Sequence, residues 1–160
     1  MARLDEITEH KNTILQRLVG NQEICKAVFY QDKNFLSKPD VKPKQVIYNN
    51  IYPFNYIPPT SEAVGTAKSY ITISLTDYSK SKNSKFKVGQ LIVRVFTHKD
   101  LFVTDEGALR PDFIVQRIDE LLNEQRGIGI GELEFTRLQE IMINQDYLGL
   151  MVTYRPVNFN

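Results

Sequence analysis

The chain has 160 residues, of which 42% are hydrophobic, 24% charged and 11% aromatic. These proportions are those of one globular domain and exclude a fully disordered chain. The balance of 20 lysines and arginines against 19 acidic residues argues against a general nucleic-acid coat. The single cysteine excludes an internal disulfide, and no apolar run approaches the roughly 20 residues that span a bilayer. We therefore expect one domain over residues 1–160, intracellular or bound to a particle, without membrane contact.

An amphipathic helix is predicted at the start of the chain, because apolar residues recur there on one helical stripe. They are Leu4, Ile7, Ile14, Leu15 and Leu18. Gly20 ends this helix, and Asn21 is the expected N-cap of a second short helix that runs through Cys25 to Phe29. We expect Cys25 to be a small buried hydrophobe between the two helices.

Residues 31–67 differ from the rest of the chain in their prolines and aromatics. Five of the seven prolines lie here, a density that blocks long helices and central strands. The aromatic content is too high for a disordered linker, so we expect an extended segment that packs its rings onto a surface, its own or a neighbour's, with a short strand at Gln45–Tyr48. An extended arm docked on a neighbouring subunit fits both observations. Its expected contact residues are Tyr48, Tyr52, Phe54 and Tyr56.

A long antiparallel hairpin gives the clearest β signal. Residues Tyr70–Thr76 alternate apolar and polar side chains, and so does part of Val88–Thr97, with the polar segment Asp77–Lys87 between them as the connecting loop. The second strand is apolar on both faces, which predicts a central position in its sheet.

The remaining elements complete an α+β pattern. A helix is predicted at about 111–124, because Pro111 and Asp112 suit a first helical turn. Two closing strands follow, one from Leu133 towards Ile143 and one over Leu148 to Tyr154 that Pro156 ends. The fold class is therefore α+β, with a mostly antiparallel or mixed β-sheet that contains the long hairpin and is flanked by the N-terminal helix and the helix at about 111–124.

Candidate catalytic and metal-binding residues are few. His10 and His98 do not lie at zinc-ligand spacing from each other, and a nucleophilic pair of Cys25 with His98 would need a tertiary contact. The loop acids at 100, 105 and 106 lack the alternate spacing of a calcium loop, and the glycines of 127–131 follow a helix instead of opening one, unlike a phosphate-binding loop. We expect no metal, no cofactor and no enzymatic activity.

Charge is distributed unevenly along the chain. Residues 68–99 contain seven basic residues and one acidic residue, whereas residues 100–160 contain five basic and eleven acidic ones. Lys80, Lys82, Lys85 and Lys87 make the hairpin tip a basic finger. Three interpretations stay open: a solvated loop, contact between the basic and acidic regions of neighbouring copies, or several fingers that face a nucleic-acid backbone.

A helix and three strands over roughly residues 68–156 form a recognisable pattern: Leu91-Ile-Val-Arg-Val-Phe96, Pro111-Asp-Phe-Ile-Val-Gln-Arg-Ile-Asp-Glu-Leu-Leu122, Gly129-Ile-Gly-Glu-Leu-Glu-Phe135 and Tyr147-Leu-Gly-Leu-Met-Val-Thr-Tyr154. This pattern resembles the neck proteins of tailed bacteriophages, in particular the tail terminator class, which joins tail to head. The resemblance implies a hexameric ring without catalytic activity, which caps the tail tube and docks the head.

The same resemblance implies partners and a location. The partners are other copies of the chain, the tail tube protein, the head connector or stopper protein, and genomic DNA passing transiently through a lumen, where we expect Lys80, Lys82, Lys85 and Lys87. The location is the neck of the virion, after assembly in the host cytoplasm. The alternatives are a ring subunit of another head–tail connector, of stopper or adaptor type, and a small nucleic-acid-binding module that uses the basic loop at 80–87.

Overall fold

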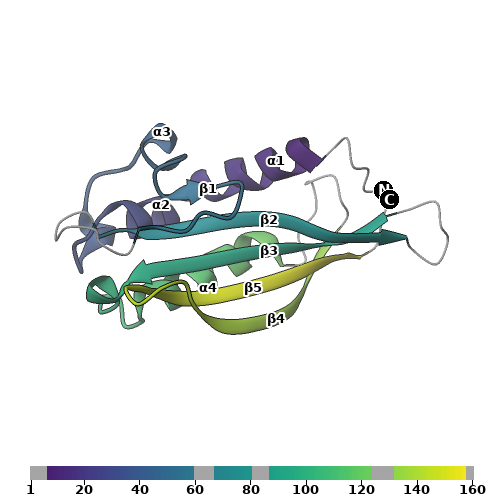
Figure 1. Ribbon diagram of the computed structural model, residues 1–160. Coiled ribbons are helices and arrows are strands. Elements are labelled where there is room, and N and C mark those ends of the chain that lie inside the picture. Colours follow the sequence, from purple (N-terminus) through teal and green to yellow (C-terminus); the bar gives the residue numbers. More distant parts are fainter. Residues whose placement is uncertain (1–6, 60–66, 81–86, 124–131, 158–160) are drawn as a thin grey trace.

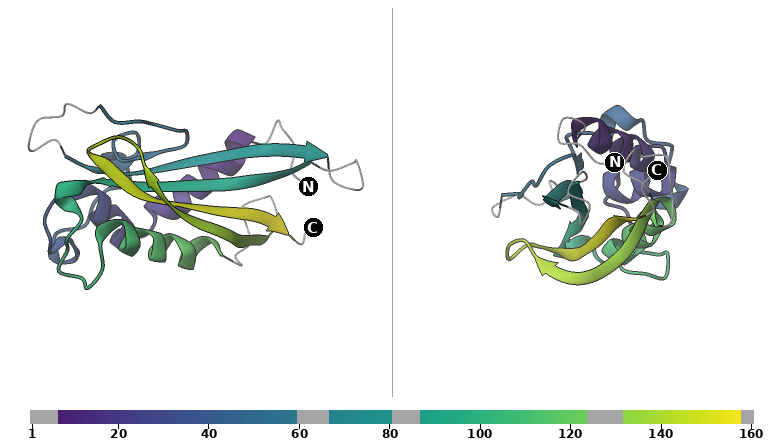
Figure 2. Two further views of the ribbon diagram at one scale, coloured as in Figure 1. Left: turned by 60° about the horizontal axis from the view of Figure 1, so that its bottom comes forward. Right: turned by 90° about the vertical axis from the view of Figure 1, so that its right-hand side faces the viewer.

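The computed structural model describes residues 7–59, 67–80, 87–123 and 132–157 (Figure 1). These residues form an α+β fold with a five-stranded mixed sheet, as the sequence predicts. The main helices are α1 (Ile7–Val19), α2 (Gln22–Phe29) and α4 (Arg110–Leu122). All three pack on one face of the sheet, as the end-on view of Figure 2 shows, so the sheet has a helix face and an open face.

The strands are β1 (Ile51–Tyr52), β2 (Ser69–Lys80), β3 (Lys87–His98), β4 (Glu132–Met142) and β5 (Tyr147–Val157). Their order across the sheet is β1-β2-β3-β5-β4, with β1 parallel to β2 and the other pairs antiparallel. The predicted central position of the second hairpin strand is confirmed, since β3 pairs with β2 on one side and β5 on the other. β1 and β4 form the two edges (Figure 1).

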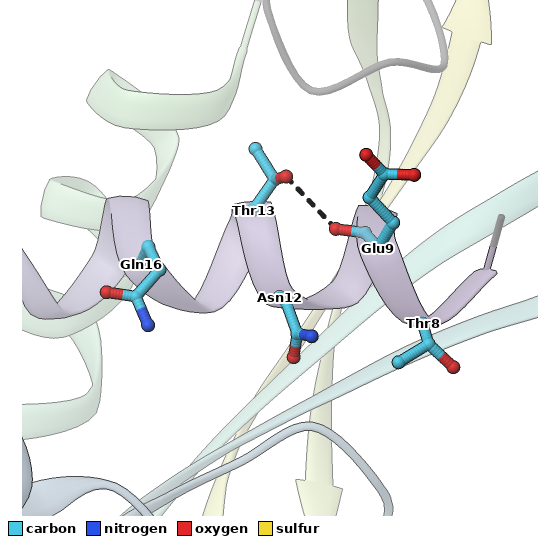
Figure 3. Close-up of a pocket in the computed structure, with 5 residues that line it drawn as sticks. All are labelled: Thr8, Glu9, Asn12, Thr13 and Gln16. Atoms are coloured by element: carbon cyan, nitrogen blue, oxygen red, sulfur yellow. Dashed lines mark hydrogen bonds between the residues drawn. The ribbon is translucent and has the colours of Figure 1, made fainter.

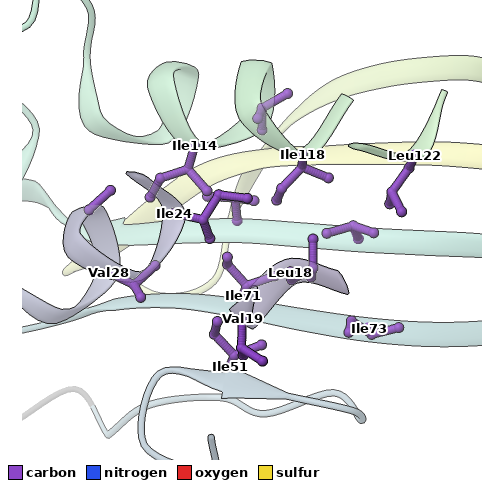
Figure 4. Packing of buried hydrophobic residues seen from close by; sticks show 14 of the residues in the cluster. Leu18, Val19, Ile24, Val28, Ile51, Ile71, Ile73, Ile114, Ile118 and Leu122 are labelled. Carbon is purple, nitrogen blue, oxygen red and sulfur yellow. The ribbon is translucent and has the colours of Figure 1, made fainter. Parts of the chain in front are cut away.

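The main core lies between the helix face of the sheet and the three helices. The register places Ile71 opposite Val95 and Val93 opposite Val152, so one apolar layer runs across β2, β3 and β5. Ile114, Ile118 and Leu122 of α4 and Leu18 and Val19 of α1 cover this layer (Figure 4). Burial of these side chains is the main stabilising contribution to the fold.

Local signals placed the first two helices correctly. The side chain of Asn21 accepts a hydrogen bond of 3.0 Å from the backbone N–H of Ile24, which confirms the predicted N-cap of α2. Cys25 is fully buried, and its thiol donates to the carbonyl oxygen of Val19. Burial without a charged partner raises the pKa of this thiol to about 11.

Of the segment predicted to be extended over residues 31–67, residues 60–66 lie outside the described residues. Residues 31–59, which we call the arm, are folded rather than extended, and the predicted strand at Gln45–Tyr48 is wrong. The arm contains a 3-10 turn at Phe35–Ser37, the short helix α3 (Pro43–Val46) and β1. The helix α3 forms because Pro43 suits a first helical turn and because the Gln45 side chain accepts a hydrogen bond from the backbone N–H of Lys42. Apolar arm residues reach the main core, so the segment is part of the domain. They are Phe35, Val41, Val46 and Ile51.

Two strand boundaries also differ from the prediction. β2 continues past Asp77 to Lys80, with a register shift between Thr76 and Ser79, so the polar segment begins later than expected. Pro156 lies inside β5, opposite Leu133, instead of ending the strand. The bulge allows the polar end of β2 to remain paired as a strand. Pro156 is accommodated because a proline is tolerated near the end of a strand.

Candidate functional site

A chain of aromatic rings covers one end of the open face. Tyr70, Phe96 and Tyr147 are buried there and contact one another, with ring centroids 5.3 to 6.3 Å apart. Tyr52 and Tyr56 of the arm lie over them and stack on each other at 4.3 Å with an interplanar angle of 2°. These five residues, the aromatic cluster, hold the second half of the arm against the sheet.

Polar contacts fix the same part of the arm. The Asn144 side chain, in the turn between β4 and β5, donates to the carbonyl oxygen of Pro58 at 3.0 Å. Arg94 of β3 donates to the side-chain oxygens of Asn55 at 2.8 Å and of Ser74 at 3.4 Å. Burial lowers the pKa of Arg94. The arm therefore crosses the open face from β1 to the turn between β4 and β5.

Two aromatic side chains of the arm remain exposed beside β1. Tyr48 is 58% exposed and Phe54 45% exposed, and their ring centroids lie 6.4 Å apart. Together they form the arm patch. Tyr48 has a φ of 61°, a left-handed conformation that bulky residues rarely adopt. The tight turn before β1 imposes it, because the backbone N–H of Tyr48 donates to the carbonyl oxygen of Ile51 at 3.0 Å.

The four predicted arm contacts therefore fall into two pairs. Tyr52 and Tyr56 pack on the chain's own sheet, while Tyr48 and Phe54 stay available for a partner. Of the four lysines predicted to face DNA, Lys82 and Lys85 lie outside the described residues. The backbones of Lys80 and Lys87 pair across the hairpin.

A second apolar surface lies on the opposite edge strand. Phe135 is 43%, Leu138 47% and Met142 71% exposed, and all three lie on the helix side of β4, where they form the strand patch. Residues 134–140 of β4 are all exposed, which is unusual for a strand of 11 residues. Next to Met142 lies a hollow of about 330 Å³, lined by Phe102, Glu140, Ile141, Met142, Leu148 and Gly149.

The uncovered half of the open face carries arginine. A hollow of about 300 Å³, the arginine hollow, is lined by Gln90, Ile92, Thr136, Arg137, Met151, Thr153 and Arg155. It lies where β4 has a register shift between Phe135 and Arg137, at the end of the pairing between β3 and β5. Arg155 forms an exposed ion pair of 3.1 Å with Glu134. Two arginines thus border one hollow, and guanidinium groups suit phosphate oxygens.

A protein-family model matches residues 21–156 of the chain. The chain belongs to the YomW family. This family is phage-derived, from the region of Bacillus phage SPbeta, so the protein is phage-associated. Neither the curated proteins nor the solved structures contain a match to the chain. The matched range covers every element from α2 to β5, and therefore both patches and the arginine hollow.

Groups that could carry catalysis do not converge among the residues that the structure describes. Cys25 lies in the main core, whereas His98 packs its ring on Tyr147 and accepts a hydrogen bond from the backbone N–H of Asp100. Asp105 and Glu106 are exposed. In the described part of the chain no three histidine, cysteine or acidic side chains are grouped to hold a metal ion, and no helix is long and apolar enough to cross a membrane.

A further hollow, of about 570 Å³, borders the polar side of α1. Its lining residues are Thr8, Glu9, Asn12, Thr13 and Gln16 (Figure 3). All five come from one helix, and the Thr13 hydroxyl donates to the backbone carbonyl of Glu9 at 3.0 Å. A shallow surface with side chains from a single helix provides no converging groups for a small molecule.

Sequence reasoning missed the strand patch and the arginine hollow. The sequence pattern predicts a strand that contains Phe135, Leu138 and Met142, but periodicity does not reveal which strand lies at an edge of the sheet. Arg137 and Arg155 were counted within an acidic half of the chain, although the fold places both beside one hollow. The register shift before Arg137 is a tertiary feature that carries no sequence signal of its own.

Proposed function

We propose that this phage-associated chain is a structural ring subunit of the phage neck, a tail terminator that caps the tail tube and docks it to the head connector. The phage-derived family supports the setting, and the resemblance of residues 68–156 to tail terminators supports the role. In this proposal the chain forms a homohexamer, contacts the tail tube protein and the connector or stopper protein, and resides in the neck of the virion. It has no catalytic activity.

The observation that carries the proposal is the placement of exposed apolar residues. Five of the nine large hydrophobic residues that are exposed in the described part of the chain belong to the arm patch or the strand patch. The first lies beside β1 and the second on β4, at opposite edges of one sheet. Exposed apolar surface marks sites of protein contact, and two unlike patches on one subunit are what a closed ring needs.

Native mass measured by light scattering, with and without purified tail tubes, tests this proposal. We expect a ring of about six copies, or a monomer that assembles only on the tubes. A monomer that ignores tubes at all concentrations would exclude the neck role. Electron microscopy of the mixture then shows whether assembled protein lies at the end of the tube, as a terminator must, or elsewhere.

A second candidate function is nucleic-acid binding, favoured by the arginine hollow. Arg137 is exposed and, among the described residues, has no carboxylate partner, so its guanidinium is available to a phosphate group. In a ring the same surface would meet DNA transiently, whereas in a small binding module it would be the main site.

The salt dependence of DNA binding distinguishes the two roles. A module should bind duplex DNA as a monomer, and the double variant Arg137→Gln with Arg155→Gln should reduce the slope of log K against log salt by up to about 2. The control variant Lys11→Gln with Lys33→Gln removes the same charge from surfaces outside the hollow and both patches, and should leave the slope nearly unchanged. If neither double variant alters DNA binding, the DNA contact lies outside the arginine hollow.

A further inference from the structure

The two apolar patches differ in the charges that surround them. Lys42 and Lys44 are the only charged residues between positions 41 and 59, and both are exposed and precede Tyr48 closely in the chain. By the register, Glu132 and Glu134 of β4 lie on the open face, where Glu134 forms its ion pair with Arg155. The carboxylate of Glu140 is exposed on the same side of β4 as Leu138 and Met142. The arm patch thus has two lysines near it in the chain, and the strand patch has one carboxylate beside it.

We propose that the arm patch of one copy docks on the strand patch of the next copy. Tyr48 and Phe54 would then cover Leu138 and Met142 and the hollow beside them, with Lys42 and Lys44 near Glu140. This inference rests on the proposed ring and names the surfaces that close it. Burial of aromatic residues against an apolar strand, with complementary charge at the rim, is the usual composition of a stable contact.

A symmetric contact between identical patches is disfavoured by charge. Two arm patches face to face would bring four lysines together, and two strand patches would bring their Glu140 carboxylates together. Like charges across an interface oppose association, so the contact joins unlike surfaces. β1 and β4 lie at opposite edges of the sheet (Figure 1), so each copy keeps one free patch after every contact. Such contacts continue from copy to copy and form a ring where the rotation between neighbouring copies closes.

The conformation of Tyr48 supports this use of the arm. A φ of 61° is a strained backbone conformation for a tyrosine, yet 58% of the residue stays exposed. Its neighbours are firmly placed, because the buried side chain of Asn50 donates to the carbonyl oxygens of Val28 at 2.9 Å and of Ser69 at 3.0 Å. A rigid turn that presents a strained, exposed ring is preorganised for contact.

Two variants remove one patch each. In the arm variant, Tyr48→Asn keeps a residue that tolerates the left-handed backbone, and Phe54→Ser removes the second ring. In the strand variant, Leu138→Ser and Met142→Ser remove the exposed apolar side chains of β4. A control variant, Asn12→Ser with Gln16→Ser, changes exposed residues of α1 outside both patches. Circular dichroism and thermal melting show that each variant folds like the natural protein.

Sedimentation velocity then measures assembly in solution and on tail tubes. Each patch variant alone should associate at least about 100-fold more weakly than the natural protein, while the control assembles normally. An equimolar mixture of the two should form dimers and nothing larger, because one intact arm patch meets one intact strand patch. If folded variants still form rings, or if the mixture stays monomeric, the proposed docking is wrong, but the proposed ring function is not excluded. A natural protein that never assembles would overturn both.

Discussion

At the β1 end of the sheet the arm folds back and anchors four apolar residues in the core, whereas at the β4 end a strand of 11 residues presents seven consecutive exposed ones. The first edge carries an aromatic surface with two lysines near it in the chain, and the second is an open strand with apolar side chains beside Glu140. A bare edge strand is a hazard for aggregation unless a partner covers it. In the proposed ring, each edge covers the unlike edge of the next copy.

The β4 edge depends on how closely β5 approaches β3. A β-carbon added to Gly149 would lie 1.8 Å from the carbonyl oxygen of Val95 and 2.7 Å from the α-carbon of Phe96, so the backbones must separate. We expect Gly149→Ala to lower the free energy of unfolding by about 4 kcal/mol. Urea unfolding measures this. The control Gly20→Ala, whose added carbon would lie 3.3 Å from the nearest atom, should change stability by less than about 1 kcal/mol.

The arm edge depends on Arg110, which is fully buried. Its guanidinium donates to the carbonyl oxygens of Ala27 at 2.9 Å, Tyr30 at 3.1 Å and Asp32 at 3.0 Å, and burial lowers its pKa to about 10. We expect Arg110→Met to cost about 3 kcal/mol, because these carbonyls lose their donor where the arm begins. The counterpart Arg117→Met, at a half-buried position, breaks an ion pair with Glu23 and should cost less than about 1 kcal/mol. Equal losses in both variants would contradict this anchoring.

High pH should weaken the core beneath both edges. The pKa of Cys25 is about 11 in the folded protein and ordinarily 9.0, so above pH 9 the unfolded chain loses this proton more readily. Stability should therefore fall by about 2 kcal/mol between pH 9 and 11, after separate contributions are removed by comparison with Cys25→Ala. Burial and the bond to Asp119 also raise the pKa of Tyr154. Urea midpoints at several pH values test this, and equal slopes in both proteins would contradict it.

The smallest effect concerns the link between β5 and α4 behind the strand patch. The Tyr154 hydroxyl donates to a carboxylate oxygen of Asp119 at 2.6 Å. Tyr154→Phe should lower stability by about 1 kcal/mol, because the carboxylate loses a partly buried donor. Tyr48→Phe, at an exposed ring, should change stability by less than about 0.5 kcal/mol. Thermal melting of both variants makes the comparison.

Much of the fold was predictable from local patterns. The cap at Asn21, the proline that opens α4 and the two-sided apolar pattern of β3 each follow from short-range chemistry, and the structure confirms all three. The arm was misjudged because its prolines also suit short turns. In α3, Pro43 begins a helix that Gln45 caps. Proline density alone does not separate a folded irregular segment from an extended one.

The candidate site was predictable only in part. The sequence predicts that all four arm aromatics contact a neighbouring subunit. Tyr48 and Phe54 are exposed, as such a contact requires, whereas Tyr52 and Tyr56 stack on the open face of their own sheet. The sequence pattern does not distinguish these four rings, because which of them pack on the sheet depends on the tertiary fold. Local periodicity does not encode strand order. It therefore does not predict which strand lies at an edge, where the register shifts before Arg137, or which distant charged residues come together.

Cross-linking between engineered cysteines tests the contact between unlike edges most directly. Phe54→Cys and Leu138→Cys place one thiol in each patch, and the buried Cys25 provides no background reaction at neutral pH. With a short bismaleimide linker, a chain that carries both substitutions should give a ladder of multimers. A mixture of the two single variants should give mixed dimers, and each single variant alone should give none. Dimers from either single variant alone would show that like patches meet, and would contradict the account.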